Sequence, residues 1–322
     1  MKTRRLLLQS LGNFRLKDSE FDYICGMLSR VDYVKQLGFT PFEWQRKILQ
    51  DDSKRIIINA ARQSGKSTIV SSLPCHIAKY QPNSLSIVLA PTEKQAGEDM
   101  EKIKGFIQSD QTYPEIKRSS DSLIKLSNNS RIVVVPATEK AARGYSCPDL
   151  VLIDEASRVE SIVYTSGVKA MFTNNVKGVL VLLSTPAGKD GFFYEIWTNN
   201  SPSWKRYEIR SPWNPQGTSH GMDLLPYIPE YQYIQEQSKK GIIACYSPRH
   251  YREEEQRDNL LEMGSLMYRQ EYCCEFVETV DTVFSYEEVA RMFNSPIQDN
   301  FGSSVGVAPK SDIDFSVLGG SE

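Results

Sequence analysis

The stretch 60–68, with the sequence AARQSGKST, constrains the fold of this chain more than any other. It follows the apolar run 56–58, and a strand, a tight loop and a Gly-Lys-Ser helix start together form the layout of a phosphate-binding P-loop. Backbone N–H groups of such a loop and of the following helix N-terminus form an anion-binding concavity. We therefore expect Lys66 to reach the β- and γ-phosphates of a nucleotide and the Ser67 hydroxyl to bind Mg²⁺.

One position departs from the usual P-loop pattern, G-x-x-x-x-G-K-[ST]. Its first glycine is replaced by Ala60, and alanine can hold this place only if its φ angle stays negative. A Gly-Lys-Ser triplet also occurs often by chance. The prediction of a nucleotide site therefore depends on a partner motif elsewhere in the chain.

The partner motif is the segment 150–155, LVLIDE. Its apolar residues indicate a buried parallel strand that delivers Asp154 and Glu155 to its carboxyl end, where nucleotides bind in open α/β sheets. We expect Asp154 to hold the Mg²⁺ shell and Glu155 to orient the attacking water. The alternative is a strand that simply ends in solvated acids, and the upstream P-loop favours the nucleotide site over it.

Further core strands follow from apolar runs bounded by turn residues. They are predicted at 85–90, 124–126, 131–135 and 178–183, the middle two as a hairpin. Strands that alternate with helical stretches imply a parallel α/β sheet. Beyond residue 200 the periodicity weakens, and two helices are predicted there, at 252–263 and 266–276.

Composition excludes several classes of protein. With 38 Lys and Arg against 40 Asp and Glu, the net charge is −2, so only a local patch could bind nucleic acid. The length of 322 residues suggests one large or two modest domains. The sequence has no apolar run that could span a bilayer, and its start lacks the apolar core of a signal peptide. Six scattered cysteines and only three histidines argue against a zinc site, and reduced buried thiols are expected.

Five features stand in a particular order along the chain. They are Trp44-Gln45, 62–67 (RQSGKS), Arg143-Gly144, Asp154-Glu155 and Ser184-Thr185-Pro186. In this order they resemble the ATPase domain of the large terminase subunit, the motor that packages DNA in tailed bacteriophages. The resemblance covers residues 38–280, and a P-loop without its first glycine is itself typical of that family.

The resemblance implies an α/β fold, a P-loop NTPase of the additional-strand catalytic-glutamate type. Its mostly parallel central sheet would be flanked by helices, with a small C-terminal lid or linker region. The implied parts are a helical lead-in at 1–38, the ATPase core at 39–200, a lid and linker subdomain at 201–280, and a linker with the truncated start of an RNase H-like nuclease domain at 281–322. Ala308 stands where the first nuclease carboxylate is expected, and Asp312 and Asp314 follow before the sequence stops at Glu322. We therefore expect a fragment, a split protein or a truncated product that does not cut DNA.

Site residues are carried over from the family position by position. The implied nucleotide-binding residues are Gln45, Gln63, Ser64, Gly65, Lys66, Ser67, Thr68, Asp154, Ser184 and Thr185. Ser67 and Asp154 would bind Mg²⁺, Glu155 would activate water, and Ser184 and Thr185 would sense loss of the γ-phosphate.

Three of the carried-over residues have a specific role in the family, and for two of them an ordinary structural role is also open. Gln45 would read the adenine edge, although it could equally be a surface glutamine on a helix. Arg62 would lie near the phosphates. Arg143 would be an arginine finger offered to a neighbouring subunit, although it could equally be a surface arginine beside a glycine turn.

The resemblance implies an enzyme that hydrolyses ATP with Mg²⁺ and drives viral double-stranded DNA into a procapsid. The implied partners are double-stranded DNA, the portal protein, the small terminase subunit and further copies of the chain in a ring, in the host cytoplasm and not in a membrane. Two alternatives stay open. One is a helicase-like P-loop ATPase, although the chain has no second P-loop. The other is a nucleotide-gated assembly module that does not hydrolyse ATP.

Overall fold

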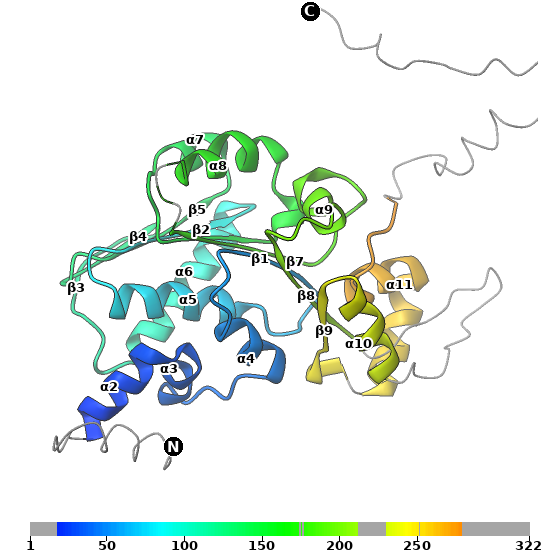
Figure 1. Cartoon of the computed structure of the whole chain (residues 1–322), viewed down its shortest axis with the longest axis horizontal. Coiled ribbons are helices and arrows are strands. Elements are labelled where there is room, and N and C mark those ends of the chain that lie inside the picture. Colours follow the sequence, from blue (N-terminus) through cyan, green and yellow to red (C-terminus); the bar gives the residue numbers. More distant parts are fainter. Residues whose placement is uncertain (1–17, 174, 176, 212–229, 251, 279–322) are drawn as a thin grey trace, which may run out of the picture. The chain divides into compact units, whose positions relative to one another are not determined.

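The computed structural model describes residues 18–173, 175, 177–211, 230–250 and 252–278. These residues form a nine-stranded sheet in the order β3-β4-β5-β2-β6-β7-β1-β8-β9 (Figure 1). The strands are β1 Arg55–Ala60, β2 Leu85–Ala90, β3 Ile116–Ser119, β4 Leu123–Leu126, β5 Arg131–Pro136, β6 Leu150–Asp154, β7 Val179–Ser184, β8 Lys205–Arg210 and β9 Ile242–Tyr246. Only the pairs β3–β4 and β4–β5 are antiparallel, so the sheet is mostly parallel, as predicted.

Helices cover both faces of this sheet. Figure 1 shows α7, α8 and α9 on one face and α4, α5 and α6 on the other. The α-helices are α2 Asp18–Leu28, α3 Arg30–Gln36, α4 Glu43–Leu49, α5 Ser67–Tyr80, α6 Glu93–Gln108, α7 Glu139–Arg143, α8 Lys169–Met171, α9 Gly191–Thr198, α10 Glu230–Lys239 and α11 Glu253–Cys273. Short 3-10 turns lie at Ala156–Arg158 and Pro248–His250, and a π-helical turn lies at Val163–Val168.

Side chains that alternate along the central strands pack into two separate hydrophobic cores, one on each face of the sheet. In β1, Ile56 and Ile58 pack with α4, α5 and α6, while Ile57 between them packs with α8 and α9 on the other face. Successive side chains of a strand point to opposite faces, so a strand covered on both sides reads as a continuous apolar run. This explains why β1, β2, β6 and β7 were predictable from sequence.

The order of the central strands determines which residues lie side by side at the carboxyl edge of the sheet. β7 pairs with β6 on one side and with β1 on the other, so it lies between the acidic strand and the P-loop strand. This inserted strand is the additional strand that the resemblance implied. The carboxyl ends of three parallel strands, at Ala60, Asp154 and Ser184, consequently face the same side of the sheet.

The sequence prediction missed three strands, β3, β8 and β9, and the charged residues of β8 explain why that strand was missed. β8 reads KRYEIR, yet Glu208 and Arg210 are both buried. Tyr233 of α10 donates a hydrogen bond to Glu208, and the Arg210 guanidinium lies 4.4 Å from the centre of the Tyr233 ring. Charged groups that satisfy one another in this way can occupy a buried strand, which a hydrophobic pattern does not reveal. β8 and β9 thereby extend the sheet beyond β1.

Helices were predicted at the start of the chain and after residue 250, and the structure has helices in both places. DSEFDYICGML and RVDYVKQ form α2 and α3 within the predicted helical lead-in. The helices predicted at 252–263 and 266–276 form α11, which is interrupted at Gly264, where φ is +79°, and which ends at Cys273, before the predicted end. Residues 279–322 lie outside the described residues, and with them Ala308, Asp312, Asp314 and the predicted start of a nuclease domain.

Of the cysteines, Cys75, Cys245, Cys273 and Cys274 are buried as expected, whereas Cys25 is half-buried and Cys147 is exposed. In the part of the chain that the structure describes, no helix combines the length and apolar character needed to cross a membrane.

Candidate functional site

The P-loop connects the end of β1 to the start of α5. Ala60 is the last residue of β1 and pairs with Ile209 of β8, and its φ angle is not positive. An alanine therefore fits where the usual pattern has glycine. The left-handed turns fall later in the loop, at Gln63 with φ +57° and at Gly65 with φ +102°. Only Gly65 needs to be glycine, because L-residues rarely adopt such a φ angle.

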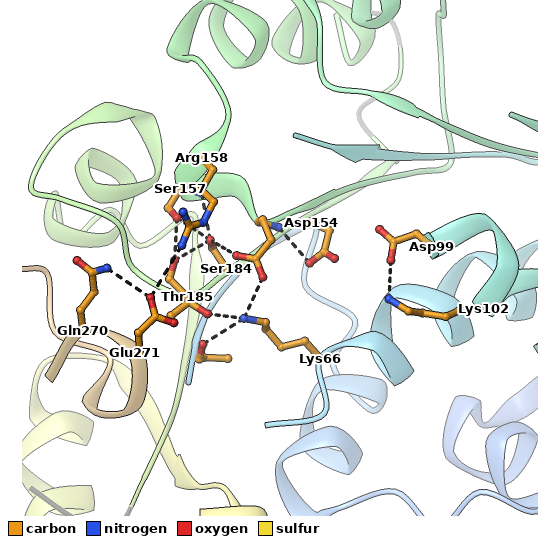
Figure 2. Close-up of polar contacts among 12 residues, drawn as sticks. Lys66, Asp99, Lys102, Asp154, Ser157, Arg158, Ser184, Thr185, Gln270 and Glu271 are labelled. Carbon is orange, nitrogen blue, oxygen red and sulfur yellow. Dashed lines mark hydrogen bonds and ion pairs between the residues drawn. The ribbon is translucent and has the colours of Figure 1, made fainter. Parts of the chain in front are cut away.

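Lys66 joins the P-loop to the acidic strand and to the strand between them. Its Nζ lies 3.2 Å from Glu155 Oε1 and donates a hydrogen bond of 2.5 Å to Thr185 Oγ1 (Figure 2). The side chains of Lys66 and Glu155 are 12% and 22% exposed, so the ion pair is partly shielded from solvent. The ammonium group of Lys66 thus connects the P-loop to two other segments that are distant in sequence.

Glu155 adopts a backbone conformation that few non-glycine residues use. Its φ and ψ angles are +46° and +45°, in the left-handed region, immediately before the 3-10 turn Ala156–Arg158. This turn lifts the Glu155 carboxylate out of the strand direction and toward the P-loop. Backbone strain of this kind concentrates at functional sites.

Ser157 is a member of the site that the sequence prediction missed. Its Oγ lies 2.7 Å from Ser184 Oγ and donates a hydrogen bond of 2.7 Å to the Thr185 carbonyl oxygen, while its N–H donates to Ser184 Oγ. Ser184 Oγ in turn lies 3.4 Å from Glu155 Oε2. The acidic strand and the predicted coupling motif are therefore connected by a small hydroxyl network (Figure 2).

Asp154 lies in an environment with an excess of negative charge. Burial, followed by the nearby carboxylates of Asp99 and Glu155, raises the pKa of Asp154 to about 7, although Lys66 and the Glu155 N–H oppose this rise. Asp99 was not predicted from sequence, and burial also raises its pKa. A cation would relieve the repulsion among these groups.

Gln45 is buried, so its alternative as a surface side chain is wrong. Its Nε2 donates a hydrogen bond of 2.9 Å to the Gly65 carbonyl oxygen, and its Oε1 accepts one of 2.8 Å from the Phe42 N–H. Gln45 thus lies against the P-loop, at the start of α4. Its role in adenine recognition stays a prediction.

A cleft of about 570 Å³ opens over the P-loop. It is lined by Arg62, Gln63, Lys66, Gln95, Glu155, Arg158, Thr185, Met263, Met267 and Glu271. The last three belong to α11, which is anchored to the loop because the Arg62 N–H donates a hydrogen bond of 2.7 Å to the Glu271 carbonyl oxygen. Five of the predicted site residues therefore share one cleft with residues that the sequence did not indicate.

Other predicted site residues surround the cleft without lining it. Ser64 is buried within the loop, Ser67 is exposed at the start of α5, and Thr68 is half-buried beside it. Arg143 lies apart, exposed at the end of α7, with its guanidinium 2.5 Å from Glu139. Within the residues that the structure describes, no three Asp, Glu, His or Cys side chains are grouped closely enough to hold a metal ion.

A family model described as "Terminase large subunit, T4likevirus-type, N-terminal" matches residues 57–291. The large terminase subunits of Thermus virus P23-45 and Thermus phage G20c are each 25% identical to the chain and align with 63% of it and 49% of their own length. The chain thus spans about half the length of these curated relatives.

Solved structures share the fold. The large terminase ATPase domain of Thermus phage P74-26 superimposes with a TM-score of 0.52 at 21% identity, over 76% of this chain and 96% of that domain. The large terminase of bacteriophage HK97 superimposes with a TM-score of 0.52 at 14% identity, over 74% of this chain and 51% of that protein. The predicted P-loop α/β fold is confirmed.

Proposed function

The chain belongs to the large terminase subunit family, and from this premise we propose that it is an ATP-hydrolysing motor that drives viral double-stranded DNA into a procapsid. The observation that carries the proposal is the convergence of Lys66, Glu155 and Thr185 at one point of the cleft. Each comes from a different segment. Together they supply a phosphate-binding cation, a carboxylate for water and a hydroxyl bonded to the cation. Such a combination serves phosphoryl transfer to water, which depends on positioning and charge stabilisation.

In the proposed reaction the P-loop binds the phosphates of ATP. N–H groups near Gly65 and at the start of α5 would bind the anion, and Lys66 would neutralise charge on the β- and γ-phosphates. Glu155 accepts a hydrogen bond from the attacking water and orients it. Arg62, exposed at the mouth of the cleft, offers a second cation to the phosphates from the same chain.

The residues present fit a Mg²⁺ ion. Asp154 is a carboxylate with a raised pKa at the end of β6, and Ser67 exposes a hydroxyl at the start of α5. Magnesium is usually bound by one or two such protein oxygens together with phosphate oxygens and water. When bound, the ion supplies charge neutralisation between the phosphates. Asp154 and Ser67 would hold it.

Ser184 and Thr185 would transmit the loss of γ-phosphate. Thr185 Oγ1 bonds to Lys66, and Ser184 Oγ bonds to Ser157, so a change at the phosphates reaches β7 directly. α11 would move with the loop because of the backbone bond between Arg62 and Glu271. We propose double-stranded DNA, the portal protein, the small terminase subunit and further copies of this chain in a ring as partners, with the host cytoplasm as the location.

The proposal is tested by Mg²⁺-dependent release of phosphate from ATP. Lys66→Ala and Glu155→Gln should each reduce turnover by about a hundredfold or more, whereas Glu101→Gln, at an exposed position of α6, should leave it unchanged. Wild-type activity that persists in both site variants would remove these residues from catalysis. No nucleotide binding by the wild type would overturn the proposed function.

A further inference from the structure

Asp99 is a buried carboxylate whose role the proposed reaction does not explain. It lies on α6, the helix that follows β2, and β2 pairs directly with β6, which ends at Asp154. Asp99 is only 2% exposed. Figure 2 shows its carboxylate extending from α6 toward Asp154.

Only one of the two carboxylate oxygens of Asp99 has a protein partner within the described residues. Oδ1 accepts a hydrogen bond of 3.1 Å from Lys102 Nζ, one helical turn away, and the Lys102 side chain is 40% exposed. Oδ2 is buried and lacks a hydrogen-bond partner in the described part of the chain. A buried carboxylate oxygen without a partner is costly, and it persists where a ligand or water completes it.

The charges around Asp99 indicate what completes it. Asp154 and Glu155 both lie close enough to interact electrostatically with Asp99, and Lys66 is already bonded to Glu155. Three carboxylates thus share a region in which Lys66 and the partly exposed Lys102 are the cations that contact them. This excess of negative charge is the environment that a hydrated divalent cation would stabilise.

We propose that Asp99 is a positioning residue of the Mg²⁺ site, where its Oδ2 accepts a hydrogen bond from a water of the ion held by Asp154 and Ser67. The inference rests on the proposed function. Direct coordination is not proposed, because no three carboxylates in the described residues are grouped closely enough to hold a metal ion. Carboxylates that hydrogen-bond the groups around a metal commonly change its affinity by about tenfold or more when removed.

The test titrates Mg²⁺ while a fluorescent ATP analogue binds, using the wild type, Asp99→Asn and Lys102→Gln at pH 8. Asp99→Asn should raise the Mg²⁺ concentration for half-maximal binding about tenfold and leave the affinity for metal-free nucleotide unchanged. Lys102→Gln removes the ion pair of Asp99 but keeps its carboxylate, so the Mg²⁺ midpoint should stay within twofold of the wild type. Asp99→Asn should not lower the melting temperature, because asparagine removes a buried charge.

Each other outcome has a distinct meaning. If both variants shift the Mg²⁺ midpoint equally, Asp99 serves only the ion pair and the inference is overturned. The same holds if both variants lower the melting temperature and leave the Mg²⁺ midpoint unchanged. An unchanged midpoint in Asp99→Asn also overturns it, while the proposed function stands. If the wild type binds neither form of the nucleotide, the proposed function itself fails.

Discussion

Lys66 Nζ lies 3.2 Å from Glu155 Oε1, so the lysine proposed to bind phosphate is paired with the glutamate proposed to activate water. Each residue therefore neutralises the other. ATP phosphates compete for Lys66, and their arrival would release the Glu155 carboxylate to bind water. The pair would hold the catalytic carboxylate inactive until nucleotide is present.

Glu155→Gln should therefore tighten nucleotide binding while it reduces turnover. Glutamine removes the ion pair with Lys66, so phosphates no longer displace it, and the dissociation constant should fall by up to about fivefold, equivalent to the roughly 1 kcal/mol of a partly exposed pair. Calorimetric titration with a non-hydrolysable ATP analogue measures this change. Lys66→Met is the comparison and should lose binding. Weaker binding by Glu155→Gln would mean that the carboxylate itself holds the nucleotide.

The pH dependence of stability should depend on Asp154. Its pKa is about 7, raised from the ordinary 3.8 by burial and then by Asp99 and Glu155. Between these values the folded protein retains a proton that the unfolded chain has released, so this carboxylate lowers stability as the pH rises from about 4 to about 7. Asp154→Asn should remove this loss and raise the melting temperature by a few degrees at pH 8, with little change at pH 4.

The control for this experiment is Asp121→Asn, which replaces an exposed carboxylate between β3 and β4. It should not alter the difference in melting temperature between pH 4 and pH 8. The measurement uses metal-free protein, because a divalent cation would itself stabilise the Asp154 carboxylate. A melting temperature at pH 8 that is lower in Asp154→Asn than in the wild type would contradict the prediction.

Two glycine-to-alanine substitutions should have opposite effects. Gly65 has φ +102°, and a Cβ there would lie 3.2 Å from Gln45 Nε2, so Gly65→Ala should destabilise the protein by about 1–3 kcal/mol and weaken nucleotide binding. Gly97 lies inside α6 with open space around it, so Gly97→Ala should stabilise by up to about 1 kcal/mol. Thermal unfolding and nucleotide titration of both variants give the comparison. Normal binding by Gly65→Ala would show that the loop tolerates another conformation.

Arg143 should act in a neighbouring subunit. It is exposed, and within the described residues its guanidinium contacts Glu139 on its own helix. An arginine finger supplied by a neighbour commonly contributes about 10³-fold or more to phosphoryl transfer. Arg143→Ala and Lys66→Ala subunits, each inactive alone, should therefore recover part of the ATPase activity when mixed under conditions in which the chain assembles.

The matched control for this mixing experiment is Arg118→Ala, which removes an exposed arginine of β3 and should retain full activity alone. An absence of recovery in a mixed assembly would contradict the action of Arg143 in a neighbouring subunit. It would leave the role of Lys66 within its own subunit untouched.

The amino-acid sequence alone determined the local features of this protein. The P-loop, the acidic strand and the strands on either side were predictable, because a buried parallel strand is an apolar run and its functional residues follow it directly in the chain. The substitution of Ala60 was also interpretable, since the φ requirement for alanine is local and the structure satisfies it.

Only the tertiary structure decided which residues complete the site. Ser184 joins Ser157 to Glu155 because β6 and β7 are neighbours, and Asp99 approaches Asp154 because β2 and β6 are neighbours. Glu271 reaches the P-loop because α11 packs beside it. β8 is hidden in sequence because its buried charges are satisfied by a tyrosine from another helix. Each of these depends on strand order and long-range packing, which a local pattern cannot carry.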